Sequence, residues 1–157
     1  MIYRKAEMAD ALETAKMFRD LAVHIRDSSG DPYWGFEDLP VEMAVPVMEG
    51  YIQGAESCIY VAEEDGVLTG MIVLEVIPCH MPLSPYPKVG YIGAGFVKKE
   101  YRRRGIMKQL EAMSHDFFRG LGIEYVEVNY LLENAGAKEN WNALGYRCFR
   151  EQARKRI

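Results

Sequence analysis

Hydrophobic and polar residues alternate along the chain with two different periods, which predict a succession of helices and strands. Apolar residues recur at helical spacing across 10–26 and again across 41–54, where Pro46 interrupts the pattern. Shorter runs alternate as strands do. The expected elements are a strand at 2–5, helices at 10–26 and 41–54, strands at 57–64, 67–77 and 91–97, a helix at 106–121, a strand at 124–132, a helix between 134 and 145, and a strand at 146–150.

Turn-forming residues define several connections between these elements. Asp65-Gly66 separates two strand-like runs, which predicts a tight hairpin. Residues 78–88 hold four of the seven prolines, and this density predicts an irregular loop. The 157 residues contain no repeat and no linker, so we expect a single domain, 1–157, with one hydrophobic core.

The segment from Val89 to Leu110 combines a glycine-rich strand, a basic turn and the start of a helix. Glycines inside a strand favour a bulge or the close approach of another backbone. The turn holds three consecutive arginines, and the amides of the helix that follows are free to bind an anion. The alternative is that the arginines form a solvated charge run. The apolar stripe expected on this helix contains Ile106, Leu110, Met113 and Phe117.

Composition narrows the kind of ligand. The net charge of −4 argues against general nucleic-acid binding, so a local basic turn suits a small polyanion better than a polymer. The three cysteines and three histidines lack metal-ligand spacing, and we expect no metal site. The sequence shows no signal peptide and no membrane-spanning run, so a cytoplasmic location and no membrane partner are expected.

Two motifs resemble those of one protein family. Val97-x-x-x-x-Arg102-x-x-Gly105-Ile106 resembles the acyl-CoA signature of the GCN5-related N-acetyltransferase superfamily, with Met107 where glycine or alanine is usual. Further along, Asn134-x-x-Ala-(x)3-Trp-(x)3-Gly-Tyr resembles the family's Asn-x-x-Ala-(x)3-Tyr-(x)3-Gly-Phe. Both motifs lie in the expected order on the expected elements.

The resemblance implies an α/β fold of three layers. Its central sheet is mixed and mostly antiparallel, and the strands at 91–97 and 124–132 splay apart to admit the pantetheine arm of acetyl-CoA. It also implies that amides near the start of the helix hold the pyrophosphate. The cofactor residues expected from it are Gly95, Phe96, Val97, Arg102, Arg103, Arg104, Gly105, Ile106, Met107, Lys108 and Asn134.

Acyl transfer to an amine requires a base for the ammonium group and an acid for the leaving thiolate. Glu127 is the first candidate for the base, on the same strand face as Asn129, and Tyr91 is the second. The family's usual acid is a tyrosine, but Trp141 occupies that position, and an indole does not donate a proton near neutral pH.

The acceptor is less well defined by the sequence. An aromatic cluster in a loop, Tyr33, Trp34 and Phe36, is either a wall of the acceptor pocket or a plug against the core, and Trp141 is a further candidate contact. The resemblance implies an N-acetyltransferase that acts on a primary amine of a small molecule or peptide, and it suggests a homodimer. The main alternative is an acyl-CoA-binding sensor or interaction module with weak catalysis, which Trp141 favours. A different nucleotide ligand is disfavoured because the glycines lack the dinucleotide-binding spacing.

Overall fold

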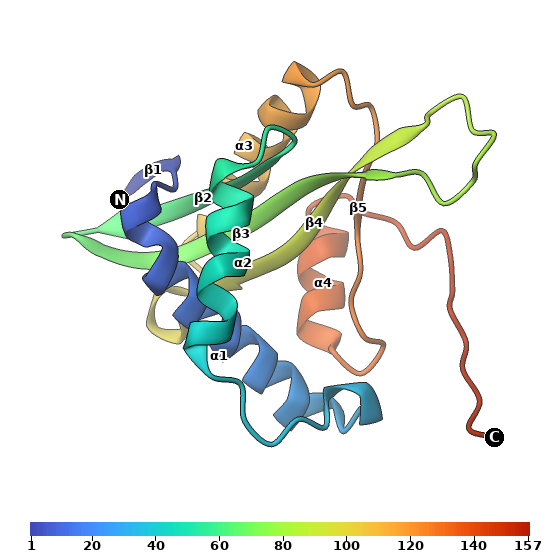
Figure 1. Cartoon of the computed structure of the whole chain (residues 1–157), viewed down its shortest axis with the longest axis horizontal. Coiled ribbons are helices and arrows are strands. Elements are labelled where there is room, and N and C mark those ends of the chain that lie inside the picture. Colours follow the sequence, from blue (N-terminus) through green and yellow to red (C-terminus); the bar gives the residue numbers. More distant parts are fainter.

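The computed structural model describes residues 1–157 and shows a five-stranded sheet with helices on both faces (Figure 1). The strands are β1 (Ile2–Lys5), β2 (Ser57–Glu64), β3 (Val67–Pro78), β4 (Lys88–Val97) and β5 (Val126–Val128). The helices are α1 (Ala11–Ser29), α2 (Val41–Gln53), α3 (Ile106–Gly120) and α4 (Ala135–Ala143), with short 3-10 turns η1 (Met8–Asp10), η2 (Pro32–Trp34) and η3 (Lys99–Tyr101). None of the helices combines the length and the apolar character needed to cross a membrane.

Strand order in the sheet follows chain order, β1 to β5. The first four strands are antiparallel neighbours, whereas β5 runs parallel to β4. The crossover that parallel pairing requires is supplied by α3. The predicted fold class, a mixed and mostly antiparallel sheet between two helical layers, is confirmed.

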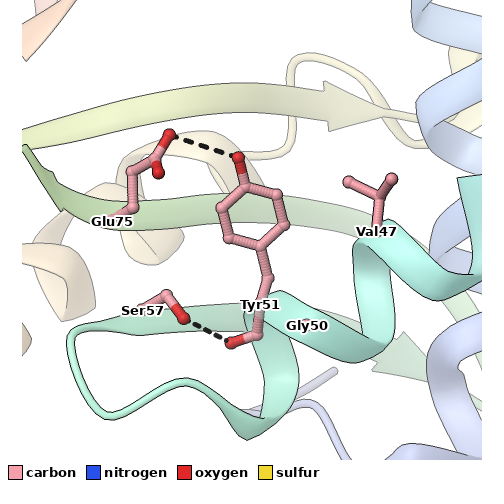
Figure 2. A pocket seen from close by; sticks show the side chains of 5 residues that line it. All are labelled: Val47, Gly50, Tyr51, Ser57 and Glu75. Atoms are coloured by element: carbon pink, nitrogen blue, oxygen red, sulfur yellow. Dashed lines mark hydrogen bonds between the residues drawn. The ribbon is translucent and has the colours of Figure 1, made fainter.

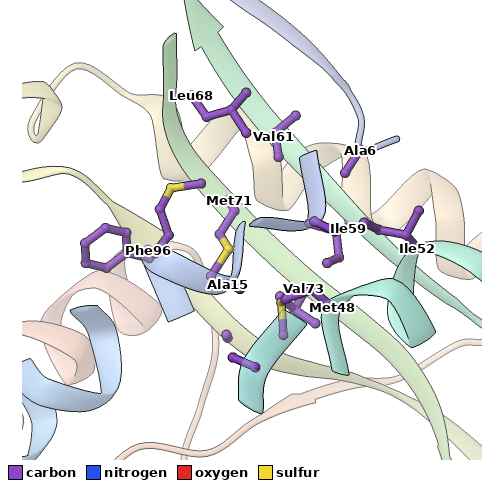
Figure 3. Close-up of a cluster of buried hydrophobic side chains, with 14 of the residues drawn as sticks. Ala6, Ala15, Met48, Ile52, Ile59, Val61, Leu68, Met71, Val73 and Phe96 are labelled. Atoms are coloured by element: carbon purple, nitrogen blue, oxygen red, sulfur yellow. The ribbon is translucent and has the colours of Figure 1, made fainter. Parts of the chain in front are cut away.

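The two faces of the sheet bury separate hydrophobic clusters, because successive side chains of a strand point to opposite faces. Met71 and Val73 of β3 pack under α1 and α2, in the cluster shown in Figure 3. Ile72 and Leu74 pack on the other face, with side chains of α3 and with Trp141 of α4. The continuous apolar run of β3 therefore reflects burial on both faces.

Two of the expected strands are wrong in extent. The strand expected at 124–132 is reduced to three residues, Val126–Val128, because its neighbour β4 diverges from it beyond that point. The strand expected at 146–150 is absent, and Phe149 is 64% exposed. A strand needs a neighbouring edge for its backbone hydrogen bonds, and β5 extends over too few residues to offer one. The predicted irregular loop is observed between β3 and β4.

The hairpin between β2 and β3 depends on its two turn residues. Asp65 and Gly66 have φ angles of 52° and 78°, as a type I′ turn requires. We expect Gly66→Ala to lower the free energy of unfolding by about 1–2 kcal/mol, because a Cβ is disfavoured in left-handed backbone. Urea unfolding would measure the loss. Asp65→Asn is the matched control, since asparagine tolerates this conformation, and equal losses in both variants would contradict the explanation.

Candidate active site

Strand β4 pairs with β5 only in the first half of its length. Pairing with β5 ends at Ile92 opposite Val128, whereas β4 continues to Val97. At the same point the register with β3 shifts between Val73 and Leu74, so that β4 has one extra residue, Gly93. This is the bulge that the glycines predicted. Beyond it, one edge of β4 has no neighbouring strand.

The backbone groups of the unpaired edge can be assigned by alternation. The Lys98 N–H donates to the Thr69 carbonyl at 2.9 Å, so residue 96 also directs its backbone groups toward β3. Gly95 and Val97 therefore direct theirs away from β3. The Val97 carbonyl accepts a hydrogen bond from the Arg102 Nε at 3.0 Å, which agrees with this assignment.

Phe96 therefore does not present its backbone groups at the unpaired edge, where it was expected to bind the cofactor. Its backbone faces β3, and its side chain is buried in the cluster under α1 and α2. On the other face of β4, Gly95 lies against Met107 and Trp141. A Cβ on Gly95 would lie 3.2 Å from Met107 Cε and 3.4 Å from Trp141 Cζ2. The side chain of Met107 therefore points toward the sheet, and the glycine leaves room beside it.

The N-terminus of α3 begins just beyond the unpaired edge. Its N-cap residue, Gly105, has a left-handed φ of 76° and no side chain that could bond the first amides. The N–H groups of Ile106, Met107 and Lys108 therefore have no acceptor within the helix. These amides and the positive end of the helix dipole favour an anion.

The three arginines of the turn differ in their partners. Arg102 is tied to the Val97 carbonyl, and Arg104 contacts Glu64 at 3.5 Å. Arg103 is exposed, has no hydrogen-bond partner and adopts a left-handed φ of 65°. The turn therefore leaves the guanidinium of Arg103 free beside the amides of α3. This combination favours an anion-binding turn over a solvated run of charges.

Asn134 has the capping role that its motif predicts. Its Oδ1 accepts a hydrogen bond from the Ala137 N–H at 3.0 Å at the start of α4. Within α4, Trp141 is 6% exposed and makes an edge-to-face contact with the ring of Tyr146, at 5.4 Å between centroids. Burial raises the pKa of the Tyr146 hydroxyl, and the charge of Glu111 adds to the shift. A raised pKa makes the Tyr146 hydroxyl a weaker proton donor than an ordinary tyrosine, so it is a poor substitute for the missing tyrosine acid.

A row of polar residues crosses four strands on the face covered by α2. Ser57 is paired with Glu75, Glu75 with Tyr91, and Tyr91 with Glu127. Residues paired across strands share a face, so all four side chains project on the same side. Asn129 follows Glu127 by two residues, and its Nδ2 donates to the Tyr91 hydroxyl at 3.4 Å.

Helix α2 contributes a further polar group to this face. The Tyr51 hydroxyl donates to Glu75 Oε1 at 3.2 Å, and the Ser57 hydroxyl donates to the Tyr51 carbonyl at 3.0 Å (Figure 2). Burial raises the pKa of Tyr51 to about 12, and the nearby Glu75 carboxylate contributes to the shift. Tyr51 is consequently a hydrogen-bond donor at neutral pH. Together with Val47 and Gly50 these side chains line an open pocket of about 310 Å³.

Gly93 leaves a notch at the point where β4 and β5 separate. A Cβ on this residue would lie 3.8 Å from Glu75 Oε1, 3.8 Å from the Tyr91 ring and 3.9 Å from the Tyr51 hydroxyl. The notch is therefore bounded by one carboxylate and two tyrosines. These groups suit a cation, which a carboxylate attracts and an aromatic face also stabilises.

The structure thus brings together the predicted catalytic residues Tyr91, Glu127 and Asn129. Trp141 lies on the opposite face of the sheet. The predicted acceptor aromatics do not line the pocket beside Glu75. Instead, Phe36 lies under the Arg26 guanidinium and Tyr33 under that of Arg154.

Two residues of this face, Glu75 and Tyr51, were missed from the sequence. Glu75 had a usable signal, since it is the one charged residue in the apolar run 67–77. Tyr51 had none, because its position opposite Glu75 depends on how α2 packs on the sheet. No group of three or more His, Cys, Asp or Glu side chains is arranged to hold a metal ion.

Comparisons with known proteins give a consistent result. A sequence profile described as "Acetyltransferase (GNAT) family" matches residues 22–146. No protein with a curated description matches the sequence. Among solved structures, a mutant of the BH1408 protein from Bacillus halodurans is similar over 100% of this chain and 99% of its own, with a TM-score of 0.85 and 19% identity.

Two aminoglycoside acetyltransferases share the fold. AAC(6')-Iy, solved with the bisubstrate analogue CoA-S-monomethyl-acetylneamine, matches over 99% of this chain and 97% of its own, with a TM-score of 0.80 and 17% identity. Aminoglycoside 6'-N-acetyltransferase AAC(6')-IG from Acinetobacter haemolyticus matches over 100% and 99%, with a TM-score of 0.74 and 14% identity. At these identities the likeness establishes the fold.

Proposed function

Because the chain belongs to the acetyltransferase (GNAT) family, we propose that it transfers the acetyl group of acetyl-CoA to a primary amine of a small molecule or peptide by direct attack. The family resemblance expected from the two motifs is confirmed, and so is acetyl-CoA as the cofactor. Acetyl-CoA supplies an activated acetyl thioester when bound. The acceptor and the roles of individual residues are our proposals.

We assign cofactor binding to the unpaired edge of β4 and the turn that follows it. The backbone groups of Gly95 and Val97 are available to an extended ligand, as an added strand would use them. The free amides of Ile106–Lys108 and the unpaired guanidinium of Arg103 suit a pyrophosphate. Asn134, at the end of the segment that follows β5, is the last of the proposed cofactor contacts.

We assign acceptor binding to the sheet face covered by α2, at the row of polar residues. Glu127 and Tyr91 are paired across β5 and β4, one residue before the pairing of the two strands ends. Glu127 takes a proton from the ammonium group of the acceptor, and Asn129 orients the Tyr91 hydroxyl beside it. The acidic and aromatic character of this face supports a small cationic amine. AAC(6')-Iy, which shares the fold, is an aminoglycoside N-acetyltransferase.

Protonation of the leaving thiolate is left to solvent. Trp141 has no proton to give near neutral pH, and the Tyr146 hydroxyl is buried against Glu111 with a raised pKa. A thiolate is a good leaving group, so the missing acid slows the reaction without preventing it.

One observation carries this proposal: the open edge of β4 leads directly into the free amides of α3, while Tyr91 and Glu127 stand at the start of the same opening. We expect acetyl-CoA at about 100 times its dissociation constant to stabilise the fold by roughly 2.7 kcal/mol. A thermal melt with acetyl-CoA, with CoA, and with NADH as control would measure this. An unchanged melting temperature with both acetyl-CoA and CoA would contradict the assignment of the cofactor site.

A sensor that binds acyl-CoA without turnover is the second candidate, and the replacement of the usual tyrosine by Trp141 favours it. Release of free CoA thiol over a panel of amines separates the two. A shift in melting temperature without thiol release for any amine identifies the sensor. The homodimer and the cytoplasmic location expected from the sequence stay predictions.

A further inference from the structure

We propose that Glu75, positioned by Tyr51, is a specificity-determining residue that binds a second ammonium group of the acceptor, so that the preferred acceptor is a diamine or larger polycation. This inference rests on the proposed function, because the first ammonium group is the one that Glu127 deprotonates. It assigns Glu75 to recognition and leaves the proton transfer to Glu127.

The spacing of the two glutamates supports the assignment. Glu75 and Glu127 lie on β3 and β5, with Tyr91 of β4 between them. Neighbouring strands are about 4.8 Å apart, so the backbones of the two glutamates are separated by roughly 10 Å. Two ammonium groups joined by a short carbon chain can therefore reach both carboxylates across the Tyr91 ring.

Glu75 borders two hollows on this face of the sheet. Gly93 lies beside Tyr91, and the notch above it is bounded by Glu75 Oε1, the Tyr91 ring and the Tyr51 hydroxyl. On the far side of Glu75 the open pocket continues toward Ser57. Glu75 therefore borders both the notch at Gly93 and the pocket beside Ser57.

The state of Glu75 suits ammonium binding. Its Oε1 accepts from Tyr51, and its Oε2 has no protein partner. No lysine or arginine forms an ion pair with this carboxylate, although nine other carboxylate pairs with lysine or arginine are present in the structure. Tyr51 holds the carboxylate in one orientation at the edge of the pocket, and the charge is left for a ligand.

The test compares cadaverine with n-pentylamine, which has the same carbon chain and lacks the second amine. We expect the wild-type protein to prefer cadaverine, and Glu75→Gln to raise its KM about 10- to 100-fold, the loss of one hydrogen-bonded charge. kcat and the KM of n-pentylamine should change little. Tyr51→Phe should raise the KM of cadaverine less. Glu56→Gln is the matched control, because Glu56 is a surface glutamate in the turn before β2 and is paired with Lys88.

The outcomes separate the two proposals. If n-pentylamine and cadaverine are acetylated equally well by the wild type, or lose kcat equally in Glu75→Gln, the specificity role is overturned while the acetyltransferase stands. If no amine releases thiol, the proposed function fails. The subsite is then read by melting with cadaverine in the presence of CoA. A stabilisation that Glu75→Gln abolishes supports it, and no stabilisation of the wild type overturns it.

Discussion

Glu127→Gln should lower kcat about 100- to 10,000-fold, the range expected for loss of a general base. The variant keeps the size and the hydrogen-bonding capacity of the side chain but cannot accept a proton. The KM for acetyl-CoA should stay the same, because Glu127 projects on the acceptor face, whereas the proposed cofactor contacts lie on the edge of β4 and on α3. Steady-state kinetics with a saturating amine would measure both constants.

Glu133→Gln is the matched control for this variant. Glu133 is a second glutamate nearby in sequence, but it follows β5, is exposed in the turn before α4 and lies outside the polar row. It should retain wild-type kcat. A Glu127→Gln variant with unchanged kcat would remove Glu127 from the mechanism, and Tyr91→Phe would then test the second candidate. Unchanged melting temperatures in both variants would exclude unfolding as the cause of any loss.

Local patterns were enough to predict the elements around the cofactor site. The bulge in β4 follows from its glycines, and the free start of α3 follows from Gly105 and the change to helical spacing after it. The cap at Asn134 follows from its distance to Ala137. Each of these features depends on residues close together in the sequence, where short-range geometry decides the structure.

The acceptor face was only partly predictable, for a physical reason. Tyr51 and Glu75 meet because α2 packs across the sheet, and Glu75 lies in one row with Glu127 because β4 pairs with both of their strands. Such pairs depend on strand order and register, which alternation within one strand does not specify. The strand expected at 146–150 fails similarly: its residues have a strand-like composition, but no neighbouring edge exists for them to pair with.

The helical spacing of apolar residues predicted the buried stripe of α3 only in part. Phe117 was expected on the buried stripe with Leu110, but the structure buries Phe118 and leaves Phe117 partly exposed. The buried positions Leu110, Ser114 and Phe118 are spaced by four residues, so the contact follows one ridge of the helix surface. Sequence alone does not decide which ridge a sheet will meet.

That contact leads to the largest stability effect we expect. Phe118 is 1% exposed, and its ring lies against Gly90, where a Cβ would come within 2.8 Å of Phe118 Cδ1. Phe118→Ala should lower the free energy of unfolding by about 3–5 kcal/mol, because it leaves a cavity in the core. Gly90→Ala should cost about 1–3 kcal/mol through overpacking against the same ring. Phe117→Ala, at the neighbouring and more exposed position, should cost clearly less than Phe118→Ala.

The two effects should be coupled, because they arise at one contact. In the double variant Gly90→Ala/Phe118→Ala the added methyl enters the space that the ring vacates, so the combined loss should be smaller than the sum of the single losses. Urea unfolding of the wild type, both single variants and the double variant would measure the coupling. Strictly additive losses would contradict direct packing. Since Gly90 belongs to the short stretch where β4 still pairs with β5, this packing also holds the two strands together immediately before they separate at the proposed site.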